Sequence, residues 1–179
     1  MRVITGSARG RNLTAPDGLD TRPTSDMTKG AVFSILQMMI ENSEFLDLFA
    51  GSGQMGIEAL SRGANHCVFV DRNKAATDII KRNVQAAKLT DKAQILNTDA
   101  LTYITRTADV YDIILLDPPY ASDLLLATLN AAAQKIAAGG LVVCESDQTE
   151  QLPETVDALQ LYRTYRYGRV CITVYRRKD

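Results

Sequence analysis

The stretch that most constrains the fold is Glu44 to Gly56, with the sequence Glu-Phe-Leu-Asp-Leu-Phe-Ala-Gly-Ser-Gly-Gln-Met-Gly. Its first part, Phe45 to Phe49, is short and mostly apolar, and glycine-rich sequence follows directly. This pattern predicts a buried strand, a tight turn and a helix over Gln54 to Arg62. Glycine omits the Cβ atom where a backbone bends, approaches a ligand or packs closely on a strand. We therefore expect a ligand to bind at this turn.

An acidic residue follows the next apolar run. Cys67 to Val70 predicts a second strand, and Asp71 stands at its end, 20 residues after Gly51. At that distance from a glycine-rich turn, a carboxylate can accept hydrogen bonds from two ribose hydroxyls. A glycine-rich turn alone could be only a strand-to-helix connection, but with Asp71 it predicts a nucleoside-containing cofactor. The glycines are not followed by the Lys-Ser/Thr pair of a Walker-type phosphate loop.

Length and composition limit the number of domains and the class of protein. At 179 residues, 46% hydrophobic and 23% charged, the chain suits one domain spanning residues 1–179. The net charge of −1 indicates no general affinity for nucleic acid. The chain has no apolar run of about 18 residues and no charged-then-apolar leader, which predicts a cytoplasmic protein without membrane contact.

The cysteines and the histidine give little sign of chemistry. Cys67, Cys144 and Cys171 lie inside apolar segments, at spacings unlike those of metal ligands. Their odd number and apolar setting predict reduced core thiols and no metal site. The only histidine, His66, begins a predicted strand beside charged surface, so we expect it to be exposed and not catalytic.

Strand and helix patterns alternate along the chain. Two short alternating pieces at 2–5 and 11–15 predict a hairpin or extended arm, and a helix capped by Ser25 or Asp26 should end near Glu41. The elements expected next are strands at 45–49, 67–70, 93–96, 113–116 and 141–144, helices at 54–62, 73–88, about 100–107 and 122–137, a break at Gly139-Gly140, and an antiparallel hairpin of 160–167 and 170–175. The alternation predicts an α/β fold of the Rossmann-like, doubly wound type, with a mostly parallel seven-stranded sheet and a C-terminal hairpin.

Polar residues follow every predicted parallel strand. Sheets of this type bind ligands beyond the carboxyl ends of their strands, so these residues should meet at one edge. The expected cofactor-binding residues are Asp47, Phe49, Ala50, Gly51, Ser52, Gly53, Gly56, Asp71, Arg72, Asp99 and Ala100. Asp99 could also simply cap the following helix. The fourth strand ends in Asp117-Pro118-Pro119-Tyr120, and the fifth in Glu145-Ser146. The prolines alone could be a rigid loop exit, but the flanking Asp117 and Tyr120 favour a functional site.

These motifs resemble a known family. Asp47 to Gly56 with Asp71 resembles the S-adenosylmethionine site of Rossmann-like methyltransferases, and Asp117 to Tyr120 resembles their signature for methylating exocyclic amino groups of bases. The chain more closely resembles the bacterial small-subunit (16S) ribosomal RNA guanine-N2 methyltransferases, through Arg2 to Gly6, Arg9 to Arg11, Arg22 to Asp26, Phe49 to Gly53 and Gly56 to Arg62. The resemblance spans nearly the whole chain. Where the family pattern has Arg-Glu, this chain has Lys29-Gly30.

The resemblance implies S-adenosylmethionine as cofactor and 16S ribosomal RNA, free or in an assembled small subunit, as substrate. The lone pair of a base amino nitrogen is delocalised into the ring, so the enzyme must position and polarise this nitrogen. Asp117 and the Pro118 carbonyl can accept the amino hydrogens, while Pro119 holds the loop and Tyr120 offers a face on which the base can stack. We expect Asp117, Pro118, Pro119 and Tyr120 to be the catalytic residues, and a monomeric enzyme.

Positive charge is concentrated in two parts of the chain. The amino-terminal arm and loop, residues 1–25, are expected to contact RNA through Arg2, Arg9, Arg11, Arg22 and Thr24. The resemblance places Arg22 and Thr24 against the active site, where Arg22 could contact a phosphate or the cofactor carboxylate. Residues 158–178 also contain six basic residues and no acidic ones. RNA binding around Arg169 and simple solvation both remain open for that segment.

Three alternatives remain. The target could be another base amino group, adenine N6 or cytosine N4. A nicotinamide-dependent oxidoreductase would use the same glycines and Asp71, but would leave Asp117 to Tyr120 unexplained. A non-catalytic RNA-binding module would explain the basic segments but not the cofactor residues. Binding measurements with S-adenosylmethionine and NADH separate a methyltransferase from the last two classes.

Overall fold

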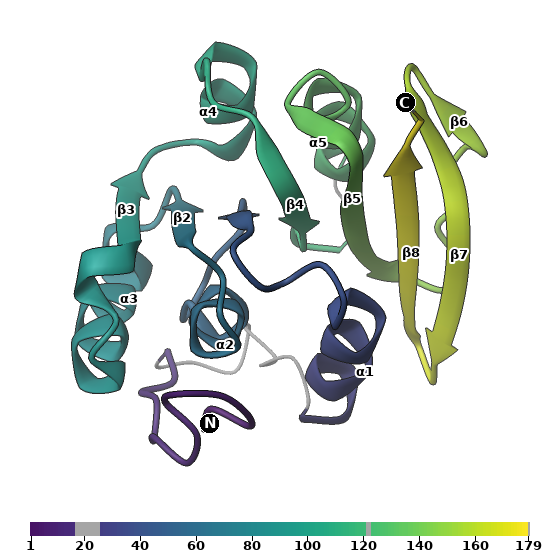
Figure 1. The fold of residues 1–179 in the computed structure, drawn as a ribbon. Coiled ribbons are helices and arrows are strands. Elements are labelled where there is room, and N and C mark those ends of the chain that lie inside the picture. Colours follow the sequence, from purple (N-terminus) through teal and green to yellow (C-terminus); the bar gives the residue numbers. More distant parts are fainter. Residues whose placement is uncertain (17–25, 121–122, 179) are drawn as a thin grey trace.

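The computed structural model describes residues 1–16, 26–120 and 123–178, and within these it contains one eight-stranded sheet of order β3-β2-β1-β4-β5-β8-β7-β6 (Figure 1). The strands are β1 (Glu44–Asp47), β2 (His66–Asp71), β3 (Ala93–Asn97), β4 (Tyr111–Leu116), β5 (Ile136–Asp147), β6 (Thr155–Val156), β7 (Leu159–Tyr167) and β8 (Val170–Arg177). The helices are α1 (Asp26–Leu36), α2 (Gln54–Ser61), α3 (Lys74–Ala87), α4 (Ala100–Arg106) and α5 (Leu124–Ala132), with the short 3₁₀ helix η1 at Thr90–Lys92.

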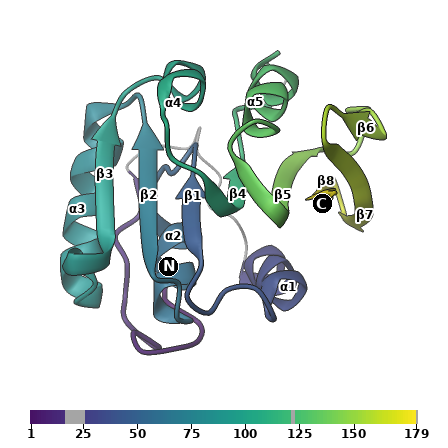
Figure 2. The same ribbon diagram turned by 45° about the horizontal axis from the view of Figure 1, so that its top comes forward.

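Helices cover both faces of the sheet, as the alternating pattern predicts. Strands β1 to β5 are parallel, whereas β8 pairs antiparallel with β5 on one side and with β7 on the other. Helices α1, α2 and α3 pack on one face around residues such as Phe45, Ile113 and Val143. Helices α4 and α5 pack on the other face around Leu46, Ile114 and similar residues, and the two layers can be followed in Figures 1 and 2. The doubly wound α/β prediction is confirmed.

The predicted strand count was too low by one. Among the described residues the sheet has eight strands and not seven, because Thr155 and Val156 pair with Gln160 and Leu159. A two-residue strand is too short to show a period in the sequence, so it could not be recognised there.

The prediction that Gly139-Gly140 end the preceding helix is wrong. Both glycines lie inside β5, which pairs with β4 at Ile136 and resumes at Leu141 after a register shift. Gly139 has a φ of +73°, which suits a bulge, so the two glycines bend the strand without ending it. Helix α5 consequently ends at Ala132, before the expected position 137.

Helix α1 is also shorter than expected and ends at Leu36 instead of near Glu41. Ile40 is buried in the same core as Leu36, so the apolar spacing of the helix continues in the sequence. The backbone of residues 37–39, however, forms a turn and not a helix. Residue 25, the alternative cap, lies outside the described residues.

The amino-terminal arm forms a minimal hairpin. Its strand pairing is a single bridge between Arg2 and Asn12, supported by the Val3 N–H on the Arg11 carbonyl and the Leu13 N–H on the Met1 carbonyl. Val3 and Leu13 are buried in the core that contains α2. The arm is therefore packed on the domain and does not extend freely from it.

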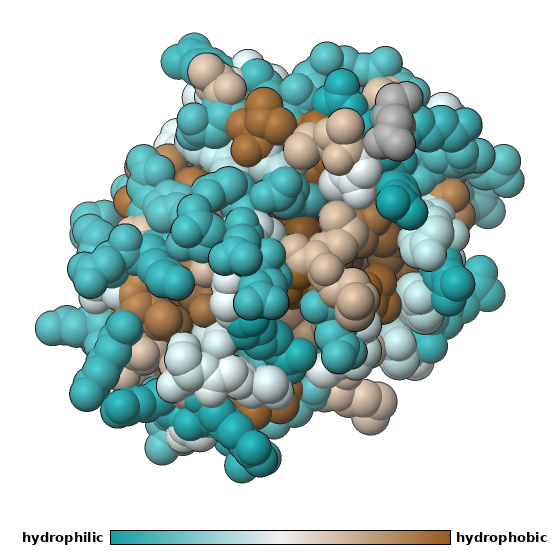
Figure 3. All heavy atoms as spheres, viewed as in Figure 1, coloured by the Kyte–Doolittle hydropathy of each residue, from teal (hydrophilic) through white to brown (hydrophobic). Residues whose placement is uncertain are grey.

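Two further features concern the surface and the thiols. None of the helices in the described ranges has the length and apolarity needed to cross a bilayer. On the face shown in Figure 3, hydrophobic residues appear as small patches between hydrophilic ones. Cys67, Cys144 and Cys171 are buried and not in disulfides, as expected.

Candidate functional site

Three carboxylates lie on one side of the sheet at the carboxyl ends of adjacent strands. Asp47 ends β1, Asp117 directly follows β4, and Glu145 stands near the end of β5. Strand register puts Asp47 opposite Leu115, and Leu116 opposite Cys144, so Asp117 comes next to Glu145. Because side chains alternate along a strand, all three project toward the layer of α1, α2 and α3.

Burial makes all three carboxylates hold their protons more tightly, and at Asp117 the charges of the other two add to this effect. Burial raises the pKa of Asp47 to about 7, although the Gly56 N–H donates to its Oδ2 at 3.0 Å. Burial, followed by the charges of Glu145 and Asp47, raises the pKa of Asp117 well above its usual value. Burial likewise raises the pKa of Glu145, opposed by a hydrogen bond from Tyr120. Such perturbed acids are typical of functional sites.

The Asp-Pro-Pro-Tyr segment leaves β4 beside these acids. Pro118 is buried, whereas Pro119 and Tyr120 are exposed. Tyr120 donates its hydroxyl to Glu145 Oε1 at 3.3 Å, and its pKa is raised to about 12 by burial and by the charges of Glu145 and Asp117. The side chain is still 51% exposed, so its ring is accessible to a stacked base.

The glycine-rich turn follows β1 and meets Asp71 at the end of β2. Gly51 and Gly53 have φ values of +54° and +76°. The Gly51 N–H donates to Asp71 Oδ2 at 2.9 Å, and the Asn73 N–H to Oδ1 at 2.8 Å. A carboxylate oxygen has more than one lone pair, so Asp71 can still accept ribose hydroxyls. A Cβ atom built on Gly51 would meet no described atom within 4 Å. The open turn and its acid fit a nucleoside cofactor.

The other predicted cofactor residues lie around this turn and the end of β3. Asp99 caps α4 by accepting the Thr102 N–H at 2.8 Å, and this bond lowers its pKa. The capping explanation for Asp99 therefore holds, and its exposed position also leaves it accessible. Ala50, Ser52 and Ala100 are buried, Phe49 is partly buried, and Arg72 is exposed. Gly56 packs closely on β2, since a Cβ atom there would lie 2.3 Å from the Phe69 ring.

The buried Glu58 of α2 holds the amino-terminal arm, a role that was not predicted from the sequence. Its carboxylate accepts the N–H groups of Ile4 and Thr5 at 2.8 and 2.9 Å and the Arg62 Nε at 2.8 Å. Lys29 lies 3.9 Å from Glu58 and donates to the Arg2 carbonyl at 2.7 Å. Burial lowers the Lys29 pKa, and the Glu58 charge opposes this shift. Lys29 is one of the two residues at which this chain differs from the family pattern, and these contacts make it a structural residue.

Asn83 of α3, also unexpected, joins the arm to the glycine-rich turn. It accepts the Thr14 N–H at 2.7 Å and donates to the Ser52 carbonyl at 2.9 Å. Arg2, Arg9 and Arg11 are exposed on this anchored arm. Arg22 and Thr24 lie outside the described residues.

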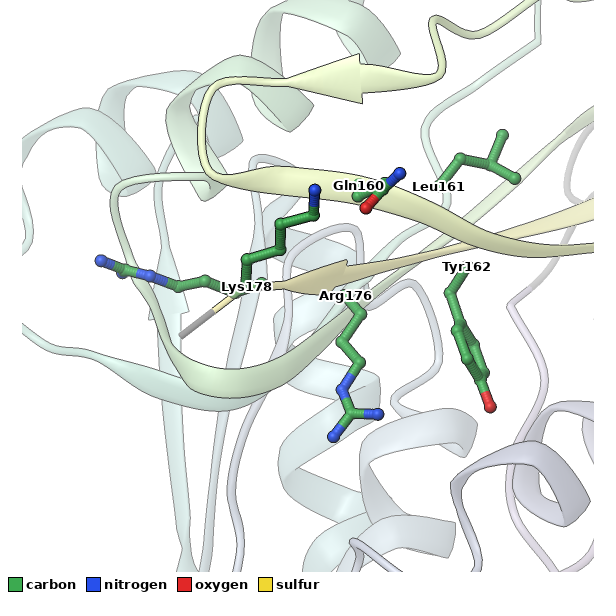
Figure 4. A pocket seen from close by; sticks show the side chains of 6 residues that line it. Gln160, Leu161, Tyr162, Arg176 and Lys178 are labelled. Atoms are coloured by element: carbon green, nitrogen blue, oxygen red, sulfur yellow. The ribbon is translucent and has the colours of Figure 1, made fainter.

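The β7–β8 hairpin brings basic residues to both ends of its strands. Arg169 lies in the turn between β7 and β8, where its backbone carbonyl accepts the Gln148 N–H. Two hydrogen bonds from Thr149 lower the pKa of Asp147, and the charge of Arg169 lowers it further. Arg169 therefore lies at the carboxyl edge of β5. The other end has a hollow of about 280 Å³, in which Tyr162 and Arg176 extend to the same side (Figure 4). This hollow contains none of the predicted site residues.

His66 is only partly buried and lies at the amino end of β2, opposite the site. Its Nδ1 is 3.7 Å from Glu44 Oε2. His66 is thus less exposed than expected.

Comparisons with known proteins agree along the whole chain. A family model described as "Conserved hypothetical protein 95" matches residues 1–176. The Bacillus subtilis protein "Putative rRNA methyltransferase YlbH" is 41% identical over 183 residues, covering 99% of this chain and 100% of that protein. Ribosomal RNA small subunit methyltransferase D of Escherichia coli is 31% identical, covering 99% of this chain and 90% of its own length. The solved structure "Putative methyltransferase yhhF from Escherichia coli" has a TM-score of 0.90 and 32% identity, covering 99% and 98% of the two chains.

Proposed function

Because this chain belongs to the family described as conserved hypothetical protein 95, we propose that it transfers a methyl group from S-adenosylmethionine to the exocyclic N2 amino group of a guanine in 16S ribosomal RNA. The observation that carries the proposal is the position of Asp117 to Tyr120 beside the glycine-rich turn. The glycine-rich turn follows β1 and Asp117 to Tyr120 follow β4, and these two strands are neighbours in the sheet. The pairing extends one residue beyond β1, because the Leu48 N–H donates to the Leu115 carbonyl at 3.1 Å. A cofactor in the turn and a base at Asp117 would thus be adjacent.

In this proposal the chain holds the cofactor along the ends of β1, β2 and β3. The Gly51 to Gly53 turn holds its methionine end, with Asp47, Phe49, Ala50 and Gly56 behind the turn. Asp71 accepts the ribose hydroxyls, while Arg72, Asp99 and Ala100 border the adenine. When bound, S-adenosylmethionine supplies a methyl group already activated by the sulfonium.

The residues after β4 act on the target nitrogen. Asp117 and the Pro118 carbonyl accept the amino hydrogens, which directs the nitrogen lone pair toward the methyl carbon and offsets the positive charge that develops. Transfer forms the nitrogen–carbon bond, breaks the sulfur–carbon bond and releases one proton from the amino group. Burial and the charges of Glu145 and Asp47 raise the pKa of Asp117, so its ionised form is a stronger proton acceptor than a carboxylate in water. Tyr120 supports the flipped base by stacking.

Mass mapping of methylated nucleotides in ribosomal RNA from cells that lack this protein tests the proposal. One N2-methylguanine should disappear from 16S RNA and return with the native chain. Loss of a methyl group from an adenine or a cytosine instead would support another base, and no change would contradict the proposal.

The cofactor placement gives a binding prediction. Asp71→Ala should weaken S-adenosylmethionine binding about tenfold or more, because the ribose loses a charged acceptor and the Gly51 N–H loses its partner. Titration calorimetry measures the change, with the exposed Asp91→Ala on η1 as control. Equal affinity in Asp71→Ala and the native chain would contradict the placement.

We propose that the RNA surface combines the amino-terminal arm, through Arg2, Arg9 and Arg11, with the loop residues Arg22 and Thr24. Arg169 at the hairpin turn extends this surface on the other side of the site. The support is that these arginines concentrate positive charge on a domain whose net charge, with them included, is −1, and that Glu58 and Asn83 hold the arm on the domain by hydrogen bonds. Rigid cations at the surface can bind phosphates with little loss of entropy.

Replacing Arg9 and Arg11 together by alanine should weaken RNA binding and leave cofactor binding unchanged. The slope of the logarithm of the affinity against the logarithm of the salt concentration should fall by the amount expected for about two lost phosphate contacts. Filter binding at several salt concentrations measures both quantities. Replacing the exposed Lys81 and Arg82 of α3 is the charge-matched control. If the RNA affinity and the salt slope of the Arg9/Arg11 variant stay native, the interface lies elsewhere, most simply at the hairpin.

We further propose that residues 1–179 act as one cytoplasmic, monomeric domain, with the RNA as macromolecular partner. Methylation assays on free 16S RNA and on assembled small subunits decide which is the substrate. Light scattering of the purified chain, alone and with substrate, tests the oligomeric state.

A further inference from the structure

Glu145 occupies a position in the site that the proposed chemistry does not use. The residue is only 8% exposed and comes next to Asp117 across the β4–β5 register. Neighbouring strands lie about 4.8 Å apart, so one edge of a base can contact both carboxylates. Tyr120, the stacking residue, donates to Glu145 Oε1 at 3.3 Å. Glu145 is therefore held beside both residues that we assign to the target base.

The bases that carry an amino group differ at the neighbouring ring nitrogen. In guanine the N1–H beside the N2 amino group is a donor, whereas adenine N1 and cytosine N3, beside their amino groups, are acceptors. Burial raises the pKa of Glu145, but the Tyr120 hydroxyl and the guanine N1–H would both donate to its ionised form and so favour that form. An ionised carboxylate only accepts hydrogen bonds and has about four lone-pair sites, so Glu145 can accept another donor besides Tyr120. Two adjacent carboxylates thus match an edge with adjacent donors.

We propose that Glu145 is the residue that selects guanine, by accepting the N1–H of the target base while Asp117 and the Pro118 carbonyl accept the N2 hydrogens. This inference rests on the proposed function. A base with an acceptor at the ring nitrogen would face the Glu145 lone pairs and be rejected. Tyr120 positions Glu145 through its hydroxyl and contacts the base through its ring.

The test replaces the target guanosine by 2-aminopurine riboside, which keeps the 2-amino group but has an acceptor at N1. Small subunits are assembled in vitro on 16S RNA that carries either nucleoside at the mapped position. Single-turnover methyl transfer is then compared between the two substrates for each protein. This ratio does not depend on how much of a preparation is folded, so a partly unfolded variant remains informative.

The native chain should transfer the methyl group to guanosine at least about tenfold faster than to 2-aminopurine riboside, because a hydrogen bond to a charged group contributes about this factor. In Glu145→Gln the amide can donate to the 2-aminopurine N1, so the preference should fall by about tenfold or reverse. Glu145→Ala, which removes both acceptor and donor, should abolish most of the preference. Asp147→Asn, two residues along the same strand and held by Thr149, should keep the native ratio.

An unchanged ratio in Glu145→Gln and Glu145→Ala would overturn the selection role while leaving the methyltransferase proposal standing. A native chain that prefers 2-aminopurine would also overturn it, because Glu145 would then act as a donor. If the native chain methylates neither substrate, the proposed function itself fails, and the inference with it.

Discussion

Asp117→Ala is expected to slow methyl transfer by about a hundredfold or more while S-adenosylmethionine binds with near-native affinity. The carboxylate accepts hydrogen from an amino group whose positive charge grows only as the methyl group is transferred, so its loss should affect the rate more than binding. The measurement is single-turnover transfer to small-subunit RNA, with cofactor affinity determined in parallel. Asp117→Asn is informative as well, because it keeps the shape of the side chain and removes the charge.

The matched control for Asp117 is Asp123→Ala. Asp123 is exposed before α5 and makes no side-chain capping bond, so its loss should leave the rate unchanged. A rate within a few fold of native in Asp117→Ala would make Asp117 a structural residue. Loss of cofactor binding together with the rate would instead show that the carboxylate supports the turn after β1.

Glu58→Ala should reduce the free energy of unfolding by about 3–5 kcal/mol. The substitution leaves the fully buried Lys29 ammonium without its main carboxylate, and the N–H groups of Ile4 and Thr5 without their acceptor. Urea unfolding measures the loss, and hydrogen exchange at Ile4 and Thr5 should show that the arm has detached. The exposed Glu41→Ala is the control and should change stability by no more than about 0.5 kcal/mol.

An unchanged unfolding midpoint in Glu58→Ala would contradict the assignment of Glu58 as the anchor of the arm. A midpoint shift without faster exchange at Ile4 and Thr5 would show that Glu58 stabilises α2 itself. The two measurements together therefore locate the effect.

The sequence was sufficient to predict the sheet edge at which the site lies. Each parallel strand is an apolar run with a polar residue at its end, and both features are local in sequence. The role proposed for Glu145 was not predictable, because it depends on the register between β4 and β5. Glu58 and Asn83 were missed for a related reason: a polar residue inside a helix has the same local pattern whether it faces solvent or a docked segment.

The errors in element boundaries arose where long-range contacts outweigh local preference. Gly139-Gly140 has the composition of a break, but β5 pairs with β4 at Ile136 before the glycines and with both β4 and β8 from Leu141 after them, so the strand passes through a bulge. Local signals describe what a segment prefers on its own, whereas the sheet decides what it does in the fold.

The position of β8 between β5 and β7 has a consequence for the order in which the molecule is built. Glu145 pairs with Ile172, and Ile172 and Tyr175 each complete a different one of the two cores. All the residues assigned to the cofactor and the base leave the ribosome before this strand does. During synthesis the nascent chain therefore carries an unpaired β5 edge beneath an unfinished site. That edge closes when residues 170 to 177 insert, so binding competence comes late in the maturation of each new molecule.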